Sequence, residues 1–162
     1  RRRMRIDCTV DGKTLNISIN SNKPLSLILQ ENLDNQSTTA HCKGRMCGLC
    51  AVLVEGKAEL SCMIPAFELK NKHITTFDQF QKSKEMKDIV KAYESLGVEP
   101  CKDCYASRSI IFESLISSGE KDEEEIKRTL SAVRCSCMNG EDEVNIVKKA
   151  QDIRKKRNVR RS

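Results

Sequence analysis

The chain has 162 residues, of which 32% are charged and 38% are hydrophobic, a composition typical of a folded globular protein and not of a disordered one. No apolar run reaches the roughly 18 to 20 residues that a membrane-spanning helix needs, so the sequence predicts no membrane span. Polar, alternating residues follow the opening "RRRMR" where a signal peptide would have an apolar stretch. We therefore expect a cytoplasmic protein.

The net charge of +6 comes from the two ends of the chain. Four arginines stand within residues 1–5 and six cations within "RKKRNVRRS" at residues 154–162, and removing these ten charges leaves residues 6–153 with a net charge of −4. Aromatic side chains, which would stack on bases, make up only 4% of the chain. We interpret the ends, including residues 1–3 and 158–162, as solvated basic tails and expect no nucleic-acid binding.

The first half of the chain alternates strand and helix signals. "RIDCTVDGKTLNISI" has alternating apolar residues on either side of a "DGK" turn, which predicts a β-hairpin with Cys8 buried between Ile6 and Val10. "PLSLILQENL" has apolar residues at helical spacing, "CAVLVEGKAELSCMI" predicts a second hairpin, and a short helix and a strand at "HITTF" follow. These elements predict a small α+β domain over residues 4–77.

Nine cysteines are many for a cytoplasmic chain, where clustered thiols usually bind metal or carry out redox chemistry. Apart from Cys8 they fall into two groups of four, and the first group has the spacing C-x4-C-x2-C-x11-C. Its members are Cys42, Cys47, Cys50 and Cys62. The second hairpin should fold Cys62 back to the loop that carries the other three, and Gly44 and Gly48 allow that loop to wrap a metal centre.

The spacing of this first group is that of plant-type 2Fe-2S sites, with the fourth cysteine closer in sequence. Structural zinc is the alternative, because four cysteines hold zinc in many small domains. Zinc ribbons, however, use two C-x2-C pairs, so the spacing favours a 2Fe-2S cluster. A disulfide framework is disfavoured because the chain carries no secretory signal.

The second half of the chain, residues 78–157, has helical periodicity throughout and predicts a separate helical domain. Four apolar stripes are separated by turn signals at Gly97, at residues 118–119 and at residues 139–140, and Asp122 with Glu125 resembles a helix-capping box. The pattern predicts a four-helix bundle. We interpret the serine and glutamate residues of these helices as solvated faces and identify no catalytic acid, base or nucleophile.

The second cysteine group lies at the junctions of this bundle, with two cysteines before the second helix and two after the third. Its members are Cys101, Cys104, Cys135 and Cys137, in the pattern C-x2-C-x30-C-x-C. Antiparallel neighbouring helices would bring these ends together, and Pro100 and residues 139–140 place both pairs on turn-like backbone. The sequence therefore predicts a second four-thiolate site.

The two motifs in this order resemble the iron-sulfur subunit of molybdenum hydroxylases, the xanthine dehydrogenase and aldehyde oxidoreductase family, over nearly the whole chain. The stretch "VLVEGKAELSCMIPAFELKNKHITTF" is very similar to the family's sequence after the first motif. The resemblance implies a β-grasp ferredoxin-like domain followed by a helical bundle. It assigns one 2Fe-2S cluster to Cys42, Cys47, Cys50 and Cys62 and a second, nearer molybdopterin, to Cys101, Cys104, Cys135 and Cys137.

The chain departs from the family's motifs at several positions. Lys43 and Arg45 replace two glycines of the usual C-G-x-G-x-C-G-x-C loop. The second motif, usually Q-C-G-x-C-x-P-G, has Pro100, Lys102, Ala106 and Ser107 at its other fixed positions. The last motif, usually C-R-C-T-G-Y, reads "CSCMNG", with Ser136, Met138 and Asn139 as replacements. The changes in these last two motifs lie where the family faces its molybdenum cofactor.

The resemblance implies that the chain is the electron-transfer subunit of a multi-subunit oxidoreductase. Electrons would pass from a molybdopterin-binding large subunit through two 2Fe-2S clusters to an FAD-binding medium subunit or another acceptor. Molybdopterin and FAD would be held by the partner subunits, and no substrate-converting site is expected on this chain. Two alternatives remain open: a two-zinc interaction module and a stand-alone ferredoxin-like electron carrier.

Overall fold

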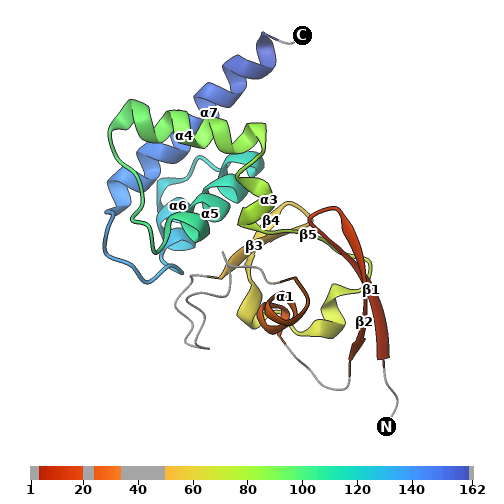
Figure 1. Cartoon of the computed structure of the whole chain (residues 1–162). Coiled ribbons are helices and arrows are strands. Elements are labelled where there is room, and N and C mark those ends of the chain that lie inside the picture. Colours follow the sequence, from red (N-terminus) through yellow and green to blue (C-terminus); the bar gives the residue numbers. More distant parts are fainter. Residues whose placement is uncertain (1–3, 20–23, 34–49, 161–162) are drawn as a thin grey trace.

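The computed structural model describes residues 4–19, 24–33 and 50–160, and these form an α+β structure. Five strands make one mixed sheet in the order β2-β1-β5-β3-β4 (Figure 1). The strands are β1 (Met4–Val10), β2 (Lys13–Ile19), β3 (Ala51–Val54), β4 (Lys57–Leu60) and β5 (His73–Thr75). β1 and β5 are parallel and the other neighbours antiparallel, so the last strand joins the two hairpins into one sheet.

Both hairpins turn through two residues with left-handed backbone. Asp11 and Gly12 have φ angles of 52° and 82°, and Glu55 and Gly56 have φ angles of 52° and 84°. Positive φ at both central positions is what a tight turn needs to match the right-handed twist of the strands. The two hairpins predicted from the sequence are confirmed.

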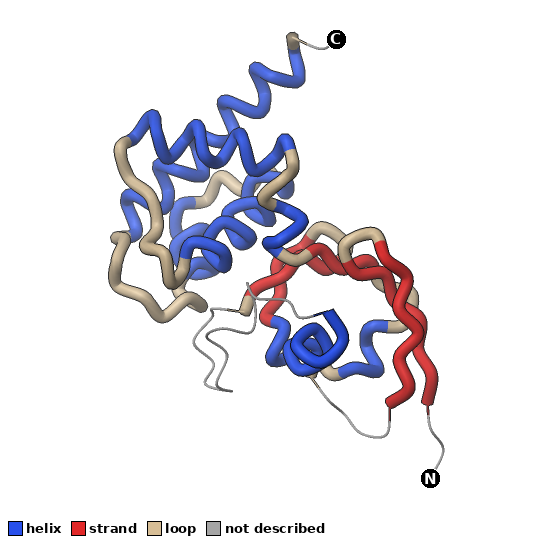
Figure 2. The backbone as a smooth tube through the Cα atoms, viewed as in Figure 1, coloured by secondary structure: helices blue, strands red, loops and turns tan. Residues whose placement is uncertain are grey.

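The sheet curves around helix α1 (Leu25–Leu33) and two short 3₁₀ helices, η1 (Ser61–Met63) and η2 (Ala66–Leu69) (Figure 2). Strand and helix side chains meet there in one hydrophobic core. Its fully buried members include Ile6, Cys8, Val10, Leu25, Leu29, Val52, Leu69 and Ile74. The prediction that Cys8 is buried is confirmed, and burial raises the pKa of its thiol.

Helices make up the second half of the chain: α3 (Phe77–Phe80), α4 (Lys84–Leu96), α5 (Tyr105–Ser118), α6 (Glu123–Leu130) and α7 (Gly140–Val159). α4 and α5 end at glycines with left-handed backbone, Gly97 and Gly119, as expected from the sequence. Asp122 caps α6 by accepting from the N–H of Glu124, but its own N–H donates to Glu120 and not to Glu125, so the reciprocal half of the predicted capping box is wrong.

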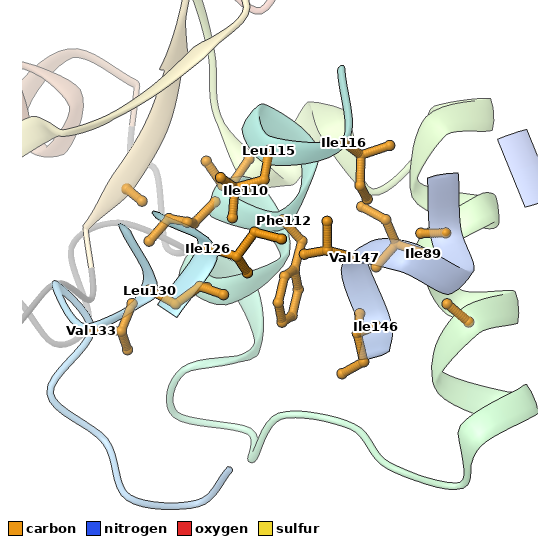
Figure 3. Packing of buried hydrophobic residues seen from close by; sticks show 14 of the residues in the cluster. Ile89, Ile110, Phe112, Leu115, Ile116, Ile126, Leu130, Val133, Ile146 and Val147 are labelled. Atoms are coloured by element: carbon orange, nitrogen blue, oxygen red, sulfur yellow. The ribbon is translucent and has the colours of Figure 1, made fainter. Parts of the chain in front are cut away.

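A second hydrophobic core joins these helices to the sheet. Figure 3 shows Phe112 of α5 among side chains of α6 and α7, and the same core includes Ala51 and Leu53 of β3. α5 contacts β3 and β4 as well as α4, α6 and α7. It is therefore buried on nearly every side, which explains why even its polar residues Ser107, Arg108 and Ser109 are inaccessible to solvent.

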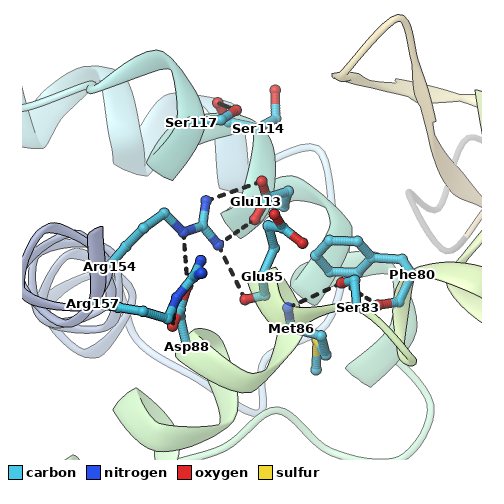
Figure 4. A network of polar contacts seen from close by, with 10 residues as sticks. All are labelled: Phe80, Ser83, Glu85, Met86, Asp88, Glu113, Ser114, Ser117, Arg154 and Arg157. Atoms are coloured by element: carbon cyan, nitrogen blue, oxygen red, sulfur yellow. Dashed lines mark hydrogen bonds and ion pairs between the residues drawn. The ribbon is translucent and has the colours of Figure 1, made fainter. Parts of the chain in front are cut away.

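The end of α7 corrects one interpretation made from the sequence. Arg154 and Arg157 were expected in a solvated basic tail, but both donate hydrogen bonds to Asp88 of α4, which is fully buried (Figure 4). Arg154 also pairs with Glu113 of α5 at 2.7 Å. The basic end of α7 therefore packs against the other helices, because its arginines form ion pairs with acids of α4 and α5.

The interpretation of the helical glutamates as solvated faces is also wrong for two of them, since Glu113 of this network and Glu143 of α7 are buried. Burial would raise the pKa of Asp88, but hydrogen bonds and charge from Arg157 and Arg154 outweigh it and hold that pKa below its ordinary value. Burial raises the pKa of Glu113, and Arg154 opposes that shift only in part.

No helix among the described residues has the length and apolar character to cross a bilayer.

Candidate metal centre

Four thiols converge where the helical half of the chain turns. The Sγ atoms of Cys101, Cys104, Cys135 and Cys137 all lie within 4.8 Å of one another. The Sγ of Cys104 is 3.5 Å from that of Cys101 and 3.3 Å from that of Cys137, and the Sγ atoms of Cys101 and Cys135 are 3.6 Å apart. The structure therefore brings together the whole second cysteine group, across more than 30 residues of sequence.

Helix ends position these thiols. α4 ends at Gly97 and the chain turns through Pro100 to Cys101, while Cys104 is the N-cap residue of α5. Cys135 and Cys137 lie in the connection between α6 and α7, and Asn139 caps α7 by accepting from the N–H of Asp142 at 2.8 Å. The positive end of the α5 dipole thus lies at Cys104, where it favours a thiolate over a thiol.

Hydrogen-bond donors surround the sulfur atoms. The backbone N–H of Cys101 donates to the Sγ of Cys137 at 3.4 Å, and the Nε of Arg108 donates to the Sγ of Cys104 at 3.3 Å. Arg108 also donates through Nη2 to the carbonyl oxygen of Cys135. Donors aimed at sulfur stabilise its negative charge, which is what a thiolate-bound metal centre requires.

Sequence reasoning missed Arg108. Nothing in the pattern of charges marks it, because it stands among serines and isoleucines in a helix whose amphipathic stripe is weak. The signal that was present is its spacing: Arg108 is four residues after Cys104, so it lies one helical turn along the same face.

The pKa values of two of the four thiols, Cys101 and Cys104, are shifted in opposite directions. A backbone hydrogen bond from Cys104 is the main cause that lowers the pKa of Cys101 to about 7. Burial raises the pKa of Cys104, and a hydrogen bond with Cys137 raises it further, while Arg108 acts in the opposite direction. Metal ligands must be deprotonated, so loading this site releases protons.

The first cysteine group is described only in part. Cys42 and Cys47, with the loop that carries them, lie outside the described residues. The second hairpin brings Cys62 back to Cys50, and the N–H of Cys62 donates to the Sγ of Cys50 at 3.4 Å. Ser61 closes the hairpin by donating its hydroxyl to the carbonyl oxygen of Cys50 at 2.7 Å. Two of the four predicted ligands therefore meet at the end of the paired strands β3 and β4.

This donor set fits a metal bound through sulfur. Four thiols with cationic and amide donors around them suit iron or zinc, and no carboxylate or imidazole is among the four ligand atoms that converge here. The described cysteines are all unbridged, so their thiols remain available as ligands. The fold and this arrangement define a thiolate-metal protein.

Comparison with known proteins identifies the metal chemistry. Residues 14–97, just over half of the chain, match the family model described as the 2Fe-2S iron-sulfur cluster binding domain. The chain belongs to this family. The matched residues include the first cysteine group and end before Cys101, so the second group is defined by its geometry.

Relatives of known function match over almost the full length. The chain is 26% identical to a nicotinate dehydrogenase subunit from Pseudomonas putida over 152 residues, covering 93% of this chain and 97% of the relative. It is 28% identical to the xanthine dehydrogenase iron-sulfur-binding subunit of Escherichia coli O157:H7 over 145 residues, covering 88% and 91%. The resemblance to iron-sulfur subunits of the xanthine dehydrogenase family is confirmed.

A solved structure has the same fold. Quinoline 2-oxidoreductase from Pseudomonas putida 86 superposes with a TM-score of 0.74 at 20% sequence identity, over 96% of this chain and 98% of the compared chain. At this identity the likeness concerns the fold alone. It agrees with the α+β class predicted from the sequence.

Proposed function

We propose that this chain is the electron-transfer subunit of a molybdenum hydroxylase and carries two 2Fe-2S clusters. Cys42, Cys47, Cys50 and Cys62 hold the first cluster, and Cys101, Cys104, Cys135 and Cys137 hold the second. The observation that carries the proposal is the convergence of the second four thiols within 4.8 Å, in a chain whose first group lies inside a 2Fe-2S family match. A bound 2Fe-2S cluster accepts and releases one electron at a time.

The chain's own residues supply ligands, hydrogen bonds and separation from solvent. Cys104 is fully buried, Cys101 and Cys135 are half-buried, and Cys137 is exposed, so the second site is sheltered at Cys104 and open to solvent at Cys137. The first site has buried Cys50 beside half-buried Cys62. The second site therefore has a sheltered part, at Cys104, and an accessible part, at Cys137, through which an electron can reach a partner.

The arrangement of the two halves suits a relay. α5 begins directly after Cys104 and packs against β3, which begins directly after Cys50. Cys50 and Cys104, one ligand of each site, are thereby held in a fixed relation by one helix and one strand. We assign residues 4–77 to a β-grasp ferredoxin-like domain and residues 78–157 to a four-helix-bundle domain, as predicted from the sequence.

The relatives support a multi-subunit complex. Proteins that match this chain over most of their length are named as subunits of nicotinate and xanthine dehydrogenases. By analogy, this chain docks with a molybdopterin-binding large subunit and an FAD-binding medium subunit, which hold those cofactors. The cytoplasmic location expected from the sequence stays a prediction, which cell fractionation would test.

Metal and sulfide analysis tests the proposal against its alternatives. The chain, purified without oxygen, should contain about four iron and four acid-labile sulfide per polypeptide and have a reddish-brown colour. About two zinc and no sulfide would contradict electron transfer and leave a two-zinc interaction module. About two iron and two sulfide would contradict the second cluster and favour a simpler ferredoxin-like carrier.

A further inference from the structure

Arg108 is the largest fully buried side chain of the described residues. Only 1% of its surface is exposed, although a guanidinium is among the groups that are most costly to remove from water. Nε donates to the Sγ of Cys104 at 3.3 Å, and Nη2 donates to the carbonyl oxygen of Cys135. A permanent positive charge therefore contacts both cysteine pairs of the second site from inside the protein.

Helix geometry fixes this contact. Side chains of an α-helix are directed toward its N-terminus, so Arg108, one turn into α5, reaches back toward the N-cap residue Cys104. The helix is firmly held there, since the N–H of Arg108 donates to the carbonyl oxygen of Cys104 at 2.8 Å. The guanidinium is thus positioned by rigid backbone at the sulfur that is deepest in the protein.

Among the described residues, Arg108 forms an ion pair with one acid, Glu143, and the geometry of this pair is poor. Glu143, in the first turn of α7, places Oε1 3.3 Å from Nη1 of Arg108. Neither this nitrogen nor the other carboxylate oxygen of Glu143 makes a hydrogen bond with the described residues. A buried ion pair stabilises a fold only when its geometry is good and its remaining polar atoms are satisfied. Simple structural pairing therefore does not account for Arg108, whose hydrogen bonds go to the cysteine site.

We propose that Arg108 raises the reduction potential of the second cluster and that Glu143 limits how far it is raised. The inference rests on the proposed function, because it requires a cluster on Cys101, Cys104, Cys135 and Cys137. Reduction adds one electron, hence one negative charge, to the site. A fixed positive charge at hydrogen-bond distance from a ligand sulfur favours the reduced form, and the low dielectric of the interior strengthens the effect.

Substitutions of the acid and the arginine in the full chain separate the two charges. Glu143→Gln removes the negative charge and keeps the size of the side chain. The double variant Arg108→Met with Glu143→Gln removes the positive charge as well, without leaving a lone buried carboxylate. Arg108→Lys keeps the charge but not the planar fork. Arg157→Gln is the matched control, because it removes an arginine that pairs with Asp88 and not with a cysteine.

Each variant is first assayed for iron and sulfide, and then titrated with dithionite under EPR at pH 8. Glu143→Gln should raise the potential of one cluster, and the double variant should lower it below that of the unaltered chain. Between these two variants, the ratio of reduced to oxidised cluster at fixed ambient potential should fall about tenfold or more. A tenfold change corresponds to about 59 mV for a one-electron couple. Arg108→Lys should fall between them, and Arg157→Gln should leave both potentials unchanged.

Opposite shifts are the signature, since a merely structural role would move both variants in the same direction. Less than a twofold difference between the two variants, with four iron in each, would overturn the inference and leave the proposed function standing. If the double variant loses its second cluster, Glu143→Gln decides alone: a raised potential supports the inference and an unchanged one overturns it. Zinc without sulfide in the unaltered chain would overturn the proposed function itself.

Discussion

The backbone N–H of Ala51 donates a hydrogen bond to the hydroxyl of Ser107, with 3.4 Å between nitrogen and oxygen. Ala51 follows Cys50 in the chain, and Ser107 lies three residues after Cys104. This buried hydrogen bond between strand β3 and helix α5 therefore links the two cysteine groups, because it lies one residue from Cys50 and three residues from Cys104. It also fixes the first turn of α5 on the sheet, and with it the position of Cys104.

Ser107→Ala should lower the free energy of unfolding by about 1 kcal/mol, because it leaves the buried N–H of Ala51 without this acceptor. Ser117→Ala, on the exposed face of the same helix, should change it by less than about 0.5 kcal/mol. Urea unfolding followed by circular dichroism measures both. Equal effects for the two variants would show that the contact between β3 and α5 adds nothing to stability.

Asp88→Asn should destabilise the protein by about 3 kcal/mol, because the buried carboxylate compensates two arginines of α7 and its removal leaves their charges unmatched. Asp152→Asn is the control, on α7 itself. Asp152 makes an exposed pair with Lys156 one turn away, which is worth at most about 0.5 kcal/mol. Thermal unfolding of the two variants should differ clearly, and similar midpoints would mean that the buried network is dispensable.

The pH dependence of stability should also show the effect of the ion pairs of Asp88. The folded pKa of Asp88 lies below its ordinary value of 3.8, so its contribution is fully present above that value and is lost as the pH falls through the folded pKa. The difference in unfolding free energy between the unaltered chain and Asp88→Asn should therefore grow from pH 3 to pH 5 and then level off. A constant difference would contradict the assigned pairing.

Glu113 should change the pH dependence of stability in the opposite direction. Burial raises its folded pKa above the ordinary 4.5, so the fold prefers the protonated form and loses part of its stability as the pH rises through this range. Glu113→Gln should accordingly remove a decline in stability as the pH rises above the ordinary pKa of 4.5. The measurement is a series of urea midpoints across that range, and a steeper decline in the variant would refute the interpretation.

Much of the fold could be predicted from local sequence, because its determinants are local. The two hairpins depend on turn residues such as Gly12 and Gly56, and α4 and α5 end at Gly97 and Gly119 because only glycine readily adopts the left-handed cap. Spacing alone also indicated that the second four cysteines meet, since helix ends in an antiparallel bundle lie together.

The buried charges could not be predicted in this way. Asp88, Glu113 and Arg154 stand on three different helices, and each looks like an ordinary solvated residue until the others are packed against it. Arg108 is similar: its acid partner, Glu143, is 35 residues further along the chain. Periodicity describes which face of one helix is apolar, whereas these contacts depend on which faces of several helices meet.

Substituting one cysteine ligand of either site should remove the cluster of that site and leave the other cluster in place. Cys62→Ser should lose the first cluster and keep about two iron and two sulfide, and Cys104→Ser should lose the second and keep the same amount. Cys8→Ser is the control, because Cys8 is buried in the hydrophobic core of the sheet and should leave all four iron in place. Loss of iron from Cys8→Ser alone would contradict the assignment of ligands.

Spin quantitation of the reduced full chain tests the central claim most directly. Each 2Fe-2S cluster gains one unpaired electron on one-electron reduction, so the dithionite-reduced protein should give two distinct EPR signals that integrate to about two spins per polypeptide. Cys104→Ser should retain one of them. A single signal of about one spin in the unaltered chain, or none, would contradict two clusters on this chain and the electron relay built on them.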